Sequence, residues 1–328
     1  MRKLLKAIAV VALGAALLFL RTGYLIVRPG SAEDLSRIVK AEQKAGTDAG
    51  SFYLVTVTQQ YASPMLLLYG LVDPIVDVRP KSSVIPPGID PKDYRKLMVR
   101  WMEESQNLAK VIALRKLGYE VPLTSDGVEV VQVEQNSPAK GLLFPGDIIT
   151  AVDGRTVYLT DELMDIVQSR PVGDTVRLEV KRNGESREVT VATTTHTELP
   201  EKAAIRVLIR TLNWQPVLPL KIDIEVGKIS GPSAGLMFVL EILNQLDPRD
   251  LTGGQKIAGT GTINLEEKIG PIGGVRQKVR AAEEQGAEYF LVPLENYEEA
   301  QTAVRSITLV PVGTLDDALH FLYSLEKR

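Results

Sequence analysis

The sequence predicts a chain of several parts that ends in an α/β (α+β) domain, preceded by a mainly-β domain and an N-terminal transmembrane helix. Three observations predict this fold class. An uninterrupted apolar run stands near the start of the chain, short strand-like segments fill its middle, and strands alternate with helices over residues 203–328. At 328 residues and 35.9 kDa, the chain is long enough for two or three domains, each with its own core.

The N-terminal segment has the pattern of a membrane anchor. A basic stretch, residues 1–6, precedes the apolar run Ala7–Leu20, and a shorter apolar piece continues to Val27. We expect residues 7–27 to cross a bilayer as one uncleaved helix, since about 20 apolar residues are needed to span it. Because the basic residues precede the run, the N-terminus is expected in the cytoplasm and the rest of the chain outside. A signal peptide cut near Gly30–Ala32 is the alternative.

Residues 31–118 predict a mixed α/β segment that ends in a long helix. Ser51 opens a β-branched and aromatic run that is typical of a strand. Ser63-Pro64 begins the short helix MLLLYGLVDP, whose apolar content predicts a buried or packed helix. Asp90-Pro91 starts a longer helical pattern, which Gly118 closes. We expect a packing role for this helix, because its apolar face contains Met98, Trp101, Leu108 and Ile112.

Residues 119–195 predict a mainly-β domain with one helix. Pro145-Gly146-Asp147 forms a turn into a strand, and Asp153-Gly154 closes a hairpin that requires positive φ angles. Thr160 caps a helix with an apolar stripe that includes Leu163 and Val167. Hydrophobic periodicity is lost over residues 191–202, which predicts a domain boundary there.

The C-terminal domain, residues 203–328, is organised around the segment GPSAGLMFVLEILNQL. A half-buried strand with Ile222 and Ile224 facing inward leads into this segment. Ser233 is then expected at or near a helix N-terminus, where the helix dipole favours negative charge. Such a position suits a nucleophile or an oxyanion. Because Pro232 has no N–H, the oxyanion donors must come from Ser233 and from Gly231 or Ser230.

A serine nucleophile needs a base, and a lysine is the best candidate. The two histidines, His196 and His320, stand in a polar stretch and on an amphipathic segment that do not suggest catalysis, and the chain has no cysteine. Lys278 falls on the apolar stripe of a helix that also contains Val275 and Val279. A desolvated amine loses its charge and can act as a base near neutral pH. From this helix alone, a lysine that extends outward to solvent is the alternative.

Residues 259–296, together with GPSAG, resemble the proteolytic domain of Lon-type serine peptidases. The resemblance implies that Ser233 is the nucleophile and that Lys278, 45 positions later, is its partner. It also implies that Thr260, in a Thr-Gly pair, orients the lysine. This chain has Ser230 where many members of the family have an acidic residue, which puts the shape of the oxyanion loop in doubt.

Residues 136–157, NSPAKGLLFPGDIITAVDGRTV, resemble the central signature of bacterial PDZ domains. These domains bind an extended peptide as an added strand between a β-edge and a helix. The resemblance implies a groove framed by residues 119–123 and 159–170. The candidate peptide-binding residues are Gly118, Tyr119, Val121, Leu163 and Val167. The alternative is a PDZ domain that serves as a spacer.

Together these parts are similar to bacterial proteins of the YlbL type. The resemblance implies an ATP-independent, membrane-anchored serine endopeptidase that acts on protein or peptide substrates and forms a homo-oligomer. A non-catalytic membrane adapter is the alternative. The net charge of −3 argues against a nucleic-acid partner. We expect no nucleotide, metal or other cofactor, because the chain has neither a GxxxxGK[ST] loop nor an HExxH motif.

Overall fold

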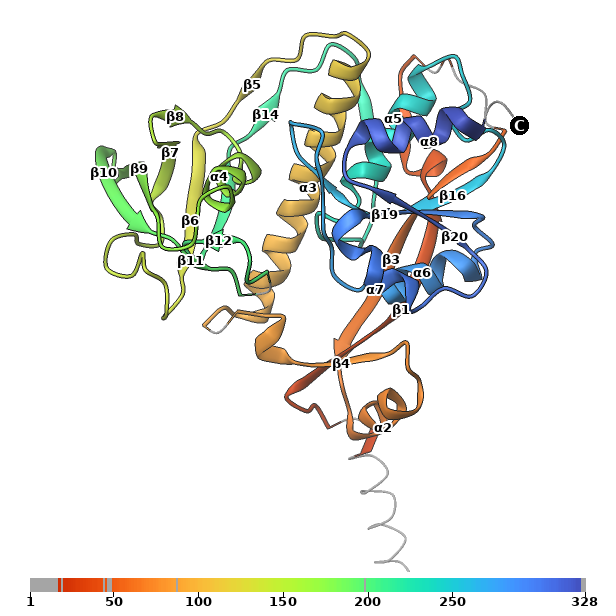
Figure 1. The fold of residues 1–328 in the computed structure, drawn as a ribbon, viewed down its shortest axis with the longest axis horizontal. Helices are drawn as coiled ribbons and strands as arrows, with labels where there is room; N and C mark the ends of the chain where they lie inside the picture. The colour runs from red at the N-terminus through yellow and green to blue at the C-terminus, as the bar shows by residue number, and fades with distance from the viewer. Residues whose placement is uncertain are drawn as a thin grey trace, which may run out of the picture. The chain divides into compact units, whose positions relative to one another are not determined.

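The computed structural model describes residues 17–18, 20–43, 45, 49–86, 88–197 and 199–325. The chain forms two compact units (Figure 1). The first unit comprises Met1–Ala109, Leu220–Ile263 and Glu267–Arg328, and the second comprises Lys110–Pro219 and Asn264–Glu266. Each unit is built around its own sheet and its own hydrophobic core.

The first unit is built from strands that precede the second unit in the sequence and strands that follow it. Its strands are β1 (Tyr24–Asp34), β2 (Val39–Ala41), β3 (Ser51–Tyr61), β4 (Asp77–Pro80), β15 (Ile222–Ile224), β16 (Lys256–Gly259), β17 (Thr262–Ile263), β18 (Ile269–Gly270), β19 (Tyr289–Pro293) and β20 (Thr308–Val312). Its α-helices are α2 (Pro64–Val72), α5 (Gly235–Leu246), α6 (Val275–Glu284), α7 (Tyr297–Gln301) and α8 (Leu315–Leu325). Its 3₁₀ turns are η1 (Leu35–Arg37), η2 (Lys81–Ser83) and η3 (Leu294–Asn296). The long helix α3 (Pro91–Lys116) begins in this unit.

A six-stranded sheet in the order β20-β19-β16-β3-β1-β4 forms the centre of the first unit. The four strands from β20 to β3 are parallel, and β1 and β4 add antiparallel pairs. Helices α5 and α8 cover one face of the sheet and α6 and α7 cover the other (Figure 1). Phe52, Phe238 and Phe290 are fully buried in this unit. The C-terminal domain is therefore α/β, as the alternation of strands and helices predicted.

The boundary predicted for the N-terminal anchor is wrong at its C-terminal end. Tyr24–Val27 belong to β1, and Leu25, Ile26 and Val27 are buried in the sheet rather than forming part of a transmembrane helix. The apolar run read as one span therefore changes structure before Tyr24. Within the described residues, no helix is long and apolar enough to cross a membrane. Residues 7–16 and residue 19 of the predicted span lie outside the described residues.

Residues 31–118 were predicted as a separate mixed α/β segment, but they do not form a separate domain. Strand β3 was predicted correctly from Ser51, but it lies in the middle of the sheet, between β16 and β1. The long helix α3 was also predicted correctly, and Gly118, at a φ of +88°, follows its end. The short helix α2 starts at the Ser63 cap as expected, yet none of its residues is buried. Of the two predicted alternatives, α2 is therefore a packed helix and not a buried one, since Leu66 and Leu67 pack against a core cluster.

The second unit is mainly β and has a sheet in the order β10-β9-β7-β6-β13. Its strands are β5 (Leu123–Thr124), β6 (Gly127–Val133), β7 (Ile148–Val152), β8 (Arg155–Thr156), β9 (Thr175–Arg182), β10 (Glu185–Ala192), β11 (Thr194–Thr195), β12 (Ala203–Ala204), β13 (Val207–Leu212) and β14 (Gln215–Pro216). Helix α4 (Thr160–Gln168) contributes Leu163 and Val167 to the core. The sequence boundary at residues 195–203 falls inside this unit, because β13 pairs with β6. The polar stretch before β13 is a loop of the domain and not a linker.

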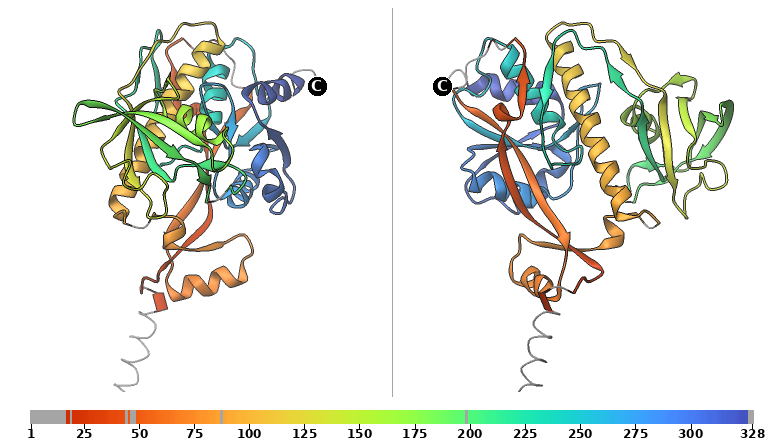
Figure 2. Two further views of the ribbon diagram at one scale, coloured as in Figure 1. Left: turned by 60° about the vertical axis from the view of Figure 1, so that its left-hand side comes forward. Right: turned by 180° about the vertical axis from the view of Figure 1, so that it is seen from behind.

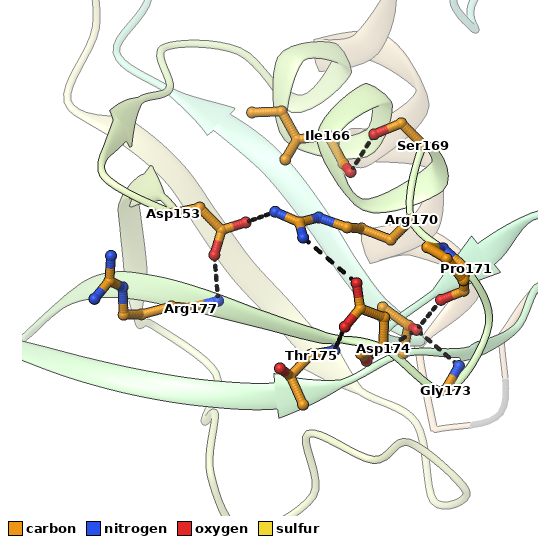
Figure 3. Close-up of polar contacts among 10 residues, drawn as sticks. Asp153, Ile166, Ser169, Arg170, Pro171, Gly173, Asp174, Thr175 and Arg177 are labelled. Carbon is orange, nitrogen blue, oxygen red and sulfur yellow. Dashed lines mark hydrogen bonds and ion pairs between the residues drawn. The ribbon is translucent and has the colours of Figure 1, made fainter.

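A charged cluster fixes the turns at one end of the second unit (Figure 3). Asp153 and Gly154 have φ angles of +52° and +80°, as the predicted hairpin turn between β7 and β8 requires. The guanidinium of Arg170, which follows α4, bridges the carboxylates of Asp153 and Asp174. Asp153 also accepts the backbone N–H of Arg177 at 3.0 Å. These contacts join the β7–β8 turn to the start of β9.

Candidate active site

Ser233 lies in the loop between β15 and α5, two residues before the helix begins. Its carbonyl oxygen accepts two hydrogen bonds, from the hydroxyl of Thr260 and from the backbone N–H of Gly261, both at 2.9 Å. The chain passes closely at Gly261, where an added Cβ would lie 2.8 Å from Ile269. The backbone of Ser233 is therefore held in place, while its side chain remains partly exposed.

Lys278 lies on α6 and points toward Ser233. Its side-chain Nζ is 2.8 Å from the Oγ of Ser233 and 2.9 Å from the Oγ1 of Thr260. Lys278 is only 3% exposed, and this burial lowers the pKa of its amine to about 7. The structure thus brings Ser233, Lys278 and Thr260 together, although they come from three separate segments of the chain.

The position of Lys278 follows from the packing of α6. Val275, Val279 and Ala282 face the core formed with β3 and β19, as their spacing predicted. The helix is preceded by Gly274, which has a φ of +71° and no room for a Cβ, since that atom would lie 2.9 Å from Val57. Burial of this face places the amine of Lys278 in the interior instead of at the solvent edge. The alternative of an outward-directed lysine is therefore wrong.

The loop before Ser233 is held by α3. The backbone N–H of Gly231 donates to the carbonyl oxygen of Met98 at 3.0 Å. The hydroxyl of Ser105 donates to the carbonyl oxygen of Pro232 at 3.1 Å. The N–H of Gly231, which was predicted with Ser230 as one of two alternative oxyanion donors, is therefore engaged by α3 in this arrangement. The amides of Ser230 and Ser233 are the remaining donors from the predicted set.

Sequence reasoning missed this role of α3 because it interpreted the helix as packing alone. A signal was present, since Ser105 stands seven positions from both Met98 and Ile112 and so falls on the apolar face. Ser105 is buried, at 4% exposure. A buried hydroxyl requires a hydrogen-bond partner, and here the partner is the loop next to Ser233.

A cavity of about 360 Å³ opens in front of Ser233 and Lys278. It lies entirely within the first unit. Its other lining residues are Leu54, Val55, Thr56, Val57, Met102, Lys228, Ile229, Ser230, Ala234 and Gly273. Strand β3 forms one wall of this cavity. The cavity is large enough to admit the side chains and backbone of a short extended peptide segment.

The wall formed by β3 has one free edge. Strand β16 pairs with β3 only from Ser51 to Leu54, whereas β1 pairs with the opposite side of β3 as far as Tyr61. Among the described strands, none continues β16 along β3 beyond Leu54. Val55, Thr56 and Val57 therefore line the cavity where the sheet lacks a neighbour.

A second cavity, of about 140 Å³, lies in the second unit between α4 and β13. Leu163 and Val167 line it, as predicted for a peptide groove, but Gly118, Tyr119 and Val121 do not. Those three residues follow the end of α3, and β13 occupies the sheet edge in their place. The predicted frame of the groove is corrected accordingly. Its second wall is formed by residues 203–207 and Ile209.

The histidines lie apart from Ser233 and Lys278 in the sequence and in their contacts. His196 lines the cavity of the second unit and accepts the N–H of Leu199 at its Nδ1. His320 lies on α8 and is exposed. Within the described part of the chain, no group of three or more histidine or carboxylate side chains could hold a metal ion.

Comparisons with known families match a part of each unit. Residues 221–324 match the family model described as the Lon protease (S16) C-terminal proteolytic domain. Residues 115–193 match the model described as a PDZ domain. The chain therefore contains a Lon-type proteolytic domain, which is a serine-type peptidase domain. It combines this domain with a PDZ domain in one polypeptide.

Several relatives share the proteolytic part. Lon protease 2 of Bacillus subtilis (strain 168) is 30% identical over 125 residues, which are 36% of this chain and 22% of that protein. Lon protease 2 of Herpetosiphon aurantiacus is 36% identical over 109 residues, which are 30% of this chain and 13% of that protein. The chain thus spans less than a quarter of the length of these relatives. A crystal structure of the PDZ domain of the SdrC-like protein from Listeria monocytogenes is 30% identical and covers 26% of this chain and 90% of that chain, at a TM-score of 0.25.

Proposed function

We propose that this chain is an ATP-independent, membrane-anchored serine endopeptidase in which Ser233 and Lys278 form the catalytic dyad. The observation that carries the proposal is the 2.8 Å separation between the Oγ of Ser233 and the buried Nζ of Lys278. Burial lowers the pKa of this amine to about 7, so a large fraction is neutral at physiological pH. The neutral amine has a lone pair that can accept the proton of the serine hydroxyl.

The reaction begins with attack of the Oγ of Ser233 on a peptide carbonyl carbon. Lys278 takes the hydroxyl proton and passes it to the leaving amine as the C–N bond breaks. The hydroxyl of Thr260 accepts an N–H of Lys278 and donates to the carbonyl of Ser233, so it aligns the amine with the nucleophile. A water molecule then releases the acyl group by the same route, with Lys278 again as the base.

The substrates are extended or unfolded peptide segments. The free edge of β3 at Val55–Val57 can pair with an incoming strand and place its carbonyl beside Ser233. Folded proteins do not present their backbone in this way, and the sequence contains no phosphate-binding loop for an ATP-driven unfolding motor. The enzyme therefore cleaves flexible tails, loops and peptides without nucleotide.

The second unit, which contains the PDZ match and is called the PDZ unit from here on, binds a second part of the substrate or a partner. Its cavity lies beside β13, which is the edge strand of its sheet. An extended peptide added to β13 would place alternate side chains against Leu163 and Val167 of α4. We further infer from the apolar run Ala7–Leu20 that the chain is anchored in the cell membrane with both domains outside the cytoplasm, and that it acts as a homo-oligomer.

A serine-directed covalent probe tests the dyad. The full chain should be labelled, and labelling should be lost in Ser233→Ala and in Lys278→Ala. Ser324→Ala, a change at an exposed serine of α8, is the matched control and should label as the parent does. Cleavage of fluorescent unfolded casein should follow the same order. A folded parent chain that neither labels nor cleaves casein would refute the peptidase and favour the non-catalytic adapter.

A further inference from the structure

Helix α2 exposes an unusual amount of apolar surface. Within the segment PMLLLYGLV, Leu68 is 57% exposed, Leu71 is 83% exposed and Val72 is 82% exposed. The helix contains no charged residue. Its inner side contacts the domain through Leu66 and Leu67, which pack on Ile26 and Val76. A surface helix normally has a polar outer face, so an apolar one indicates contact with another apolar phase.

Helix α2 lies at the end of the β1–β3–β4 strands, away from helices α5 to α8 (Figures 1 and 2). The end of the N-terminal apolar run reaches the same place. Both the N–H and the hydroxyl of Thr22 donate to the carbonyl oxygen of Ala62, which directly precedes the Ser63 cap of α2. Leu18 and Leu20, just before Thr22, are exposed. Two apolar segments that are distant in sequence thus meet at one end of the first unit.

The residues around these segments suit a membrane interface. Tyr24 and Tyr69 are exposed there, and tyrosine is enriched at the level of lipid headgroups. The guanidinium of Arg21 lies over the ring of Tyr61, 5.4 Å from its centre. Lys81 bonds through its backbone to Gly23 and so places a second cation nearby. Both cations can attract anionic headgroups.

The carboxylates at this end already have partners. Asp73 accepts hydrogen bonds from the hydroxyl of Tyr69 and from the N–H of Ile75, which lower the pKa of its carboxyl group. Asp77 pairs with Arg79 at 3.1 Å and with Arg276 at 3.3 Å. The charge of Asp77 is thus balanced by two guanidinium groups and opposes an anionic surface less than an unpaired carboxylate would, whereas Asp73 keeps its charge.

We propose that α2 is a second membrane contact, which lies in the interface of an anionic phospholipid bilayer with Leu68, Leu71 and Val72 among the acyl chains. Nine residues form a helix of about 14 Å, whereas the apolar core of a bilayer is about 30 Å thick. The helix is therefore too short to span the bilayer and must lie along its surface. Because α2 and Ser233 belong to one compact unit, this contact fixes the height of the catalytic cleft above the lipid.

The absence of cysteine from the chain permits a direct test. Leu71→Cys, labelled with an environment-sensitive fluorophore, is mixed as the full chain with vesicles of phosphatidylglycerol and phosphatidylethanolamine. Leu294→Cys is the matched control, because Leu294 is a leucine of the same unit that is 63% exposed on η3. We expect a blue-shifted emission at position 71 that lipids brominated on their acyl chains quench, and neither effect at position 294.

The inference rests on the proposed membrane location, and flotation of the vesicles separates the two. A chain that floats with vesicles but shows aqueous, unquenched emission at position 71 would overturn the role of α2 alone. A chain that does not float would overturn both. A blue shift that needs no lipid and grows with protein concentration would assign α2 to contact with a second copy instead, which also overturns the proposal. Each variant also carries Ser233→Ala, so the result does not depend on peptidase activity.

Vesicles of phosphatidylcholine alone provide a test of the charge contribution. Quenching at position 71 should then be at least twofold weaker, because Arg21 and Lys81 have no net negative surface to bind. Equal quenching in both lipids would contradict the assignment to an anionic bilayer.

Discussion

Lys278 loses its charge through burial and not through a neighbouring cation. The pKa of its amine is lowered to about 7 by desolvation, and the polar atoms around Nζ are the hydroxyls of Ser233 and Thr260. Neither hydroxyl has a charge that would keep the ammonium form. The pKa of the proposed base is therefore set by how completely the packing of α6 buries its amine.

Replacing Lys278 with arginine should abolish turnover. A guanidinium cannot lose its proton in the working pH range, so it cannot accept the proton of Ser233. We expect casein cleavage to fall by at least about 100-fold, which is the lower end of the contribution of a general base. Circular dichroism and thermal unfolding would show whether the chain remains folded. Lys278→Gln is the control for the size and charge of arginine, because glutamine is smaller and neutral. Substantial activity in a folded Lys278→Arg chain would contradict the assignment of the base.

The pH dependence of cleavage should follow the same amine. Its neutral form is the active one, and its pKa lies near 7, so kcat/KM should rise as the pH increases through about 7 and then level off. One proton should account for the slope below pH 7. Initial rates on a fluorogenic peptide between pH 5.5 and 9, roughly the range around this pKa, would measure it. A rate that is flat or falls over pH 6 to 8 would exclude Lys278 as the base.

Burial of Lys278 should also lower the stability of the fold. The folded chain has a pKa near 7 for this amine against an ordinary value of 10.5, so the unfolded chain binds the extra proton between these values. The free energy of unfolding should therefore rise with pH from 7 to about 10. Lys278→Met should stabilise the chain by up to about 4 kcal/mol at pH 7 and by much less near pH 10. Denaturant unfolding at both pH values measures the difference, and an equal effect at both would show that the amine is not responsible.

Single residues of the site were predictable where the pattern of one helix was sufficient. Lys278 stood out because an amine on an apolar stripe is unusual, and the structure places it in the interior. The bond of Gly231 to Met98 was not predictable, because it joins residues far apart in the sequence. Whether an amide is free for an oxyanion depends on such distant contacts.

Helix α3, which lies outside the Lon-type match, holds the loop that leads to Ser233. The Lon-type match begins at residue 221, yet the loop at Gly231 and Pro232 is bonded to Met98 and Ser105 of α3. The helix therefore supports the loop from a segment more than one hundred residues earlier. Ser105 acts as a positioning residue, because it reaches Ser233 only through Pro232.

Ser105→Ala should lower kcat more than it changes KM. Loss of the hydrogen bond to Pro232 removes about 0.5–1.5 kcal/mol of support, so we expect a decrease of roughly twofold to tenfold. Gln106→Ala, at the next position of α3, is the control and should leave kcat unchanged. The pH at which kcat/KM is half of its maximum should stay near 7 in both variants, since neither touches Lys278. A Ser105→Ala chain with parental kcat would contradict a positioning role.

Local patterns were sufficient for most elements but not for their exposure. The starts of β3, α2 and α3 and the turn at Asp153-Gly154 follow from capping residues and turn residues that act locally. The outer face of α2 could not be inferred, because a short apolar helix has the same sequence pattern whether it is covered by protein or left open. Which side of α2 is covered depends only on where the neighbouring strands lie in the folded chain.

The first unit is assembled from two parts of the sequence. Strands β1, β3 and β4 precede the PDZ unit, whereas β16, β19 and β20 follow it, and all six form one sheet. The chain enters and leaves the PDZ unit at neighbouring positions, because β5 pairs with β14 through Thr124 and Gln215. The PDZ unit is thus an insertion with adjacent ends.

Removing this insertion should leave a folded peptidase. A chain in which Ser125–Trp214 is replaced by Asn-Gly can close a hairpin between β5 and β14. We expect it to fold and to cleave a short fluorogenic peptide, but to lose PDZ-dependent binding. A fragment of residues 221–328 should not fold, because it lacks β3 and β1 from the middle of the sheet. A folded, active fragment 221–328 would contradict this description of the unit.

The domain order was predictable from motifs, but the domain boundaries were not. The residues that resemble PDZ and Lon-type domains stand in compact stretches, so each domain could be recognised alone. Pairing between β3 and β16 joins residues about 200 positions apart, and no local pattern reports it. Residues 31–118 were therefore predicted as a separate segment, although β3, β4 and most of β1 within them belong to the six-stranded sheet of the first unit.

The division of the first unit has a consequence for synthesis. A ribosome translates β1, β3 and β4 first, then residues 110–219 of the PDZ unit, and only afterwards the residues from Leu220 onward. Ser233 and Lys278 belong to this last portion. Strands β1, β3 and β4 are therefore made before the strands β16, β19 and β20 with which they form one sheet. The proposed peptidase can therefore form its site only after translation has passed Lys278, which lies 50 residues before the last residue of the sequence given.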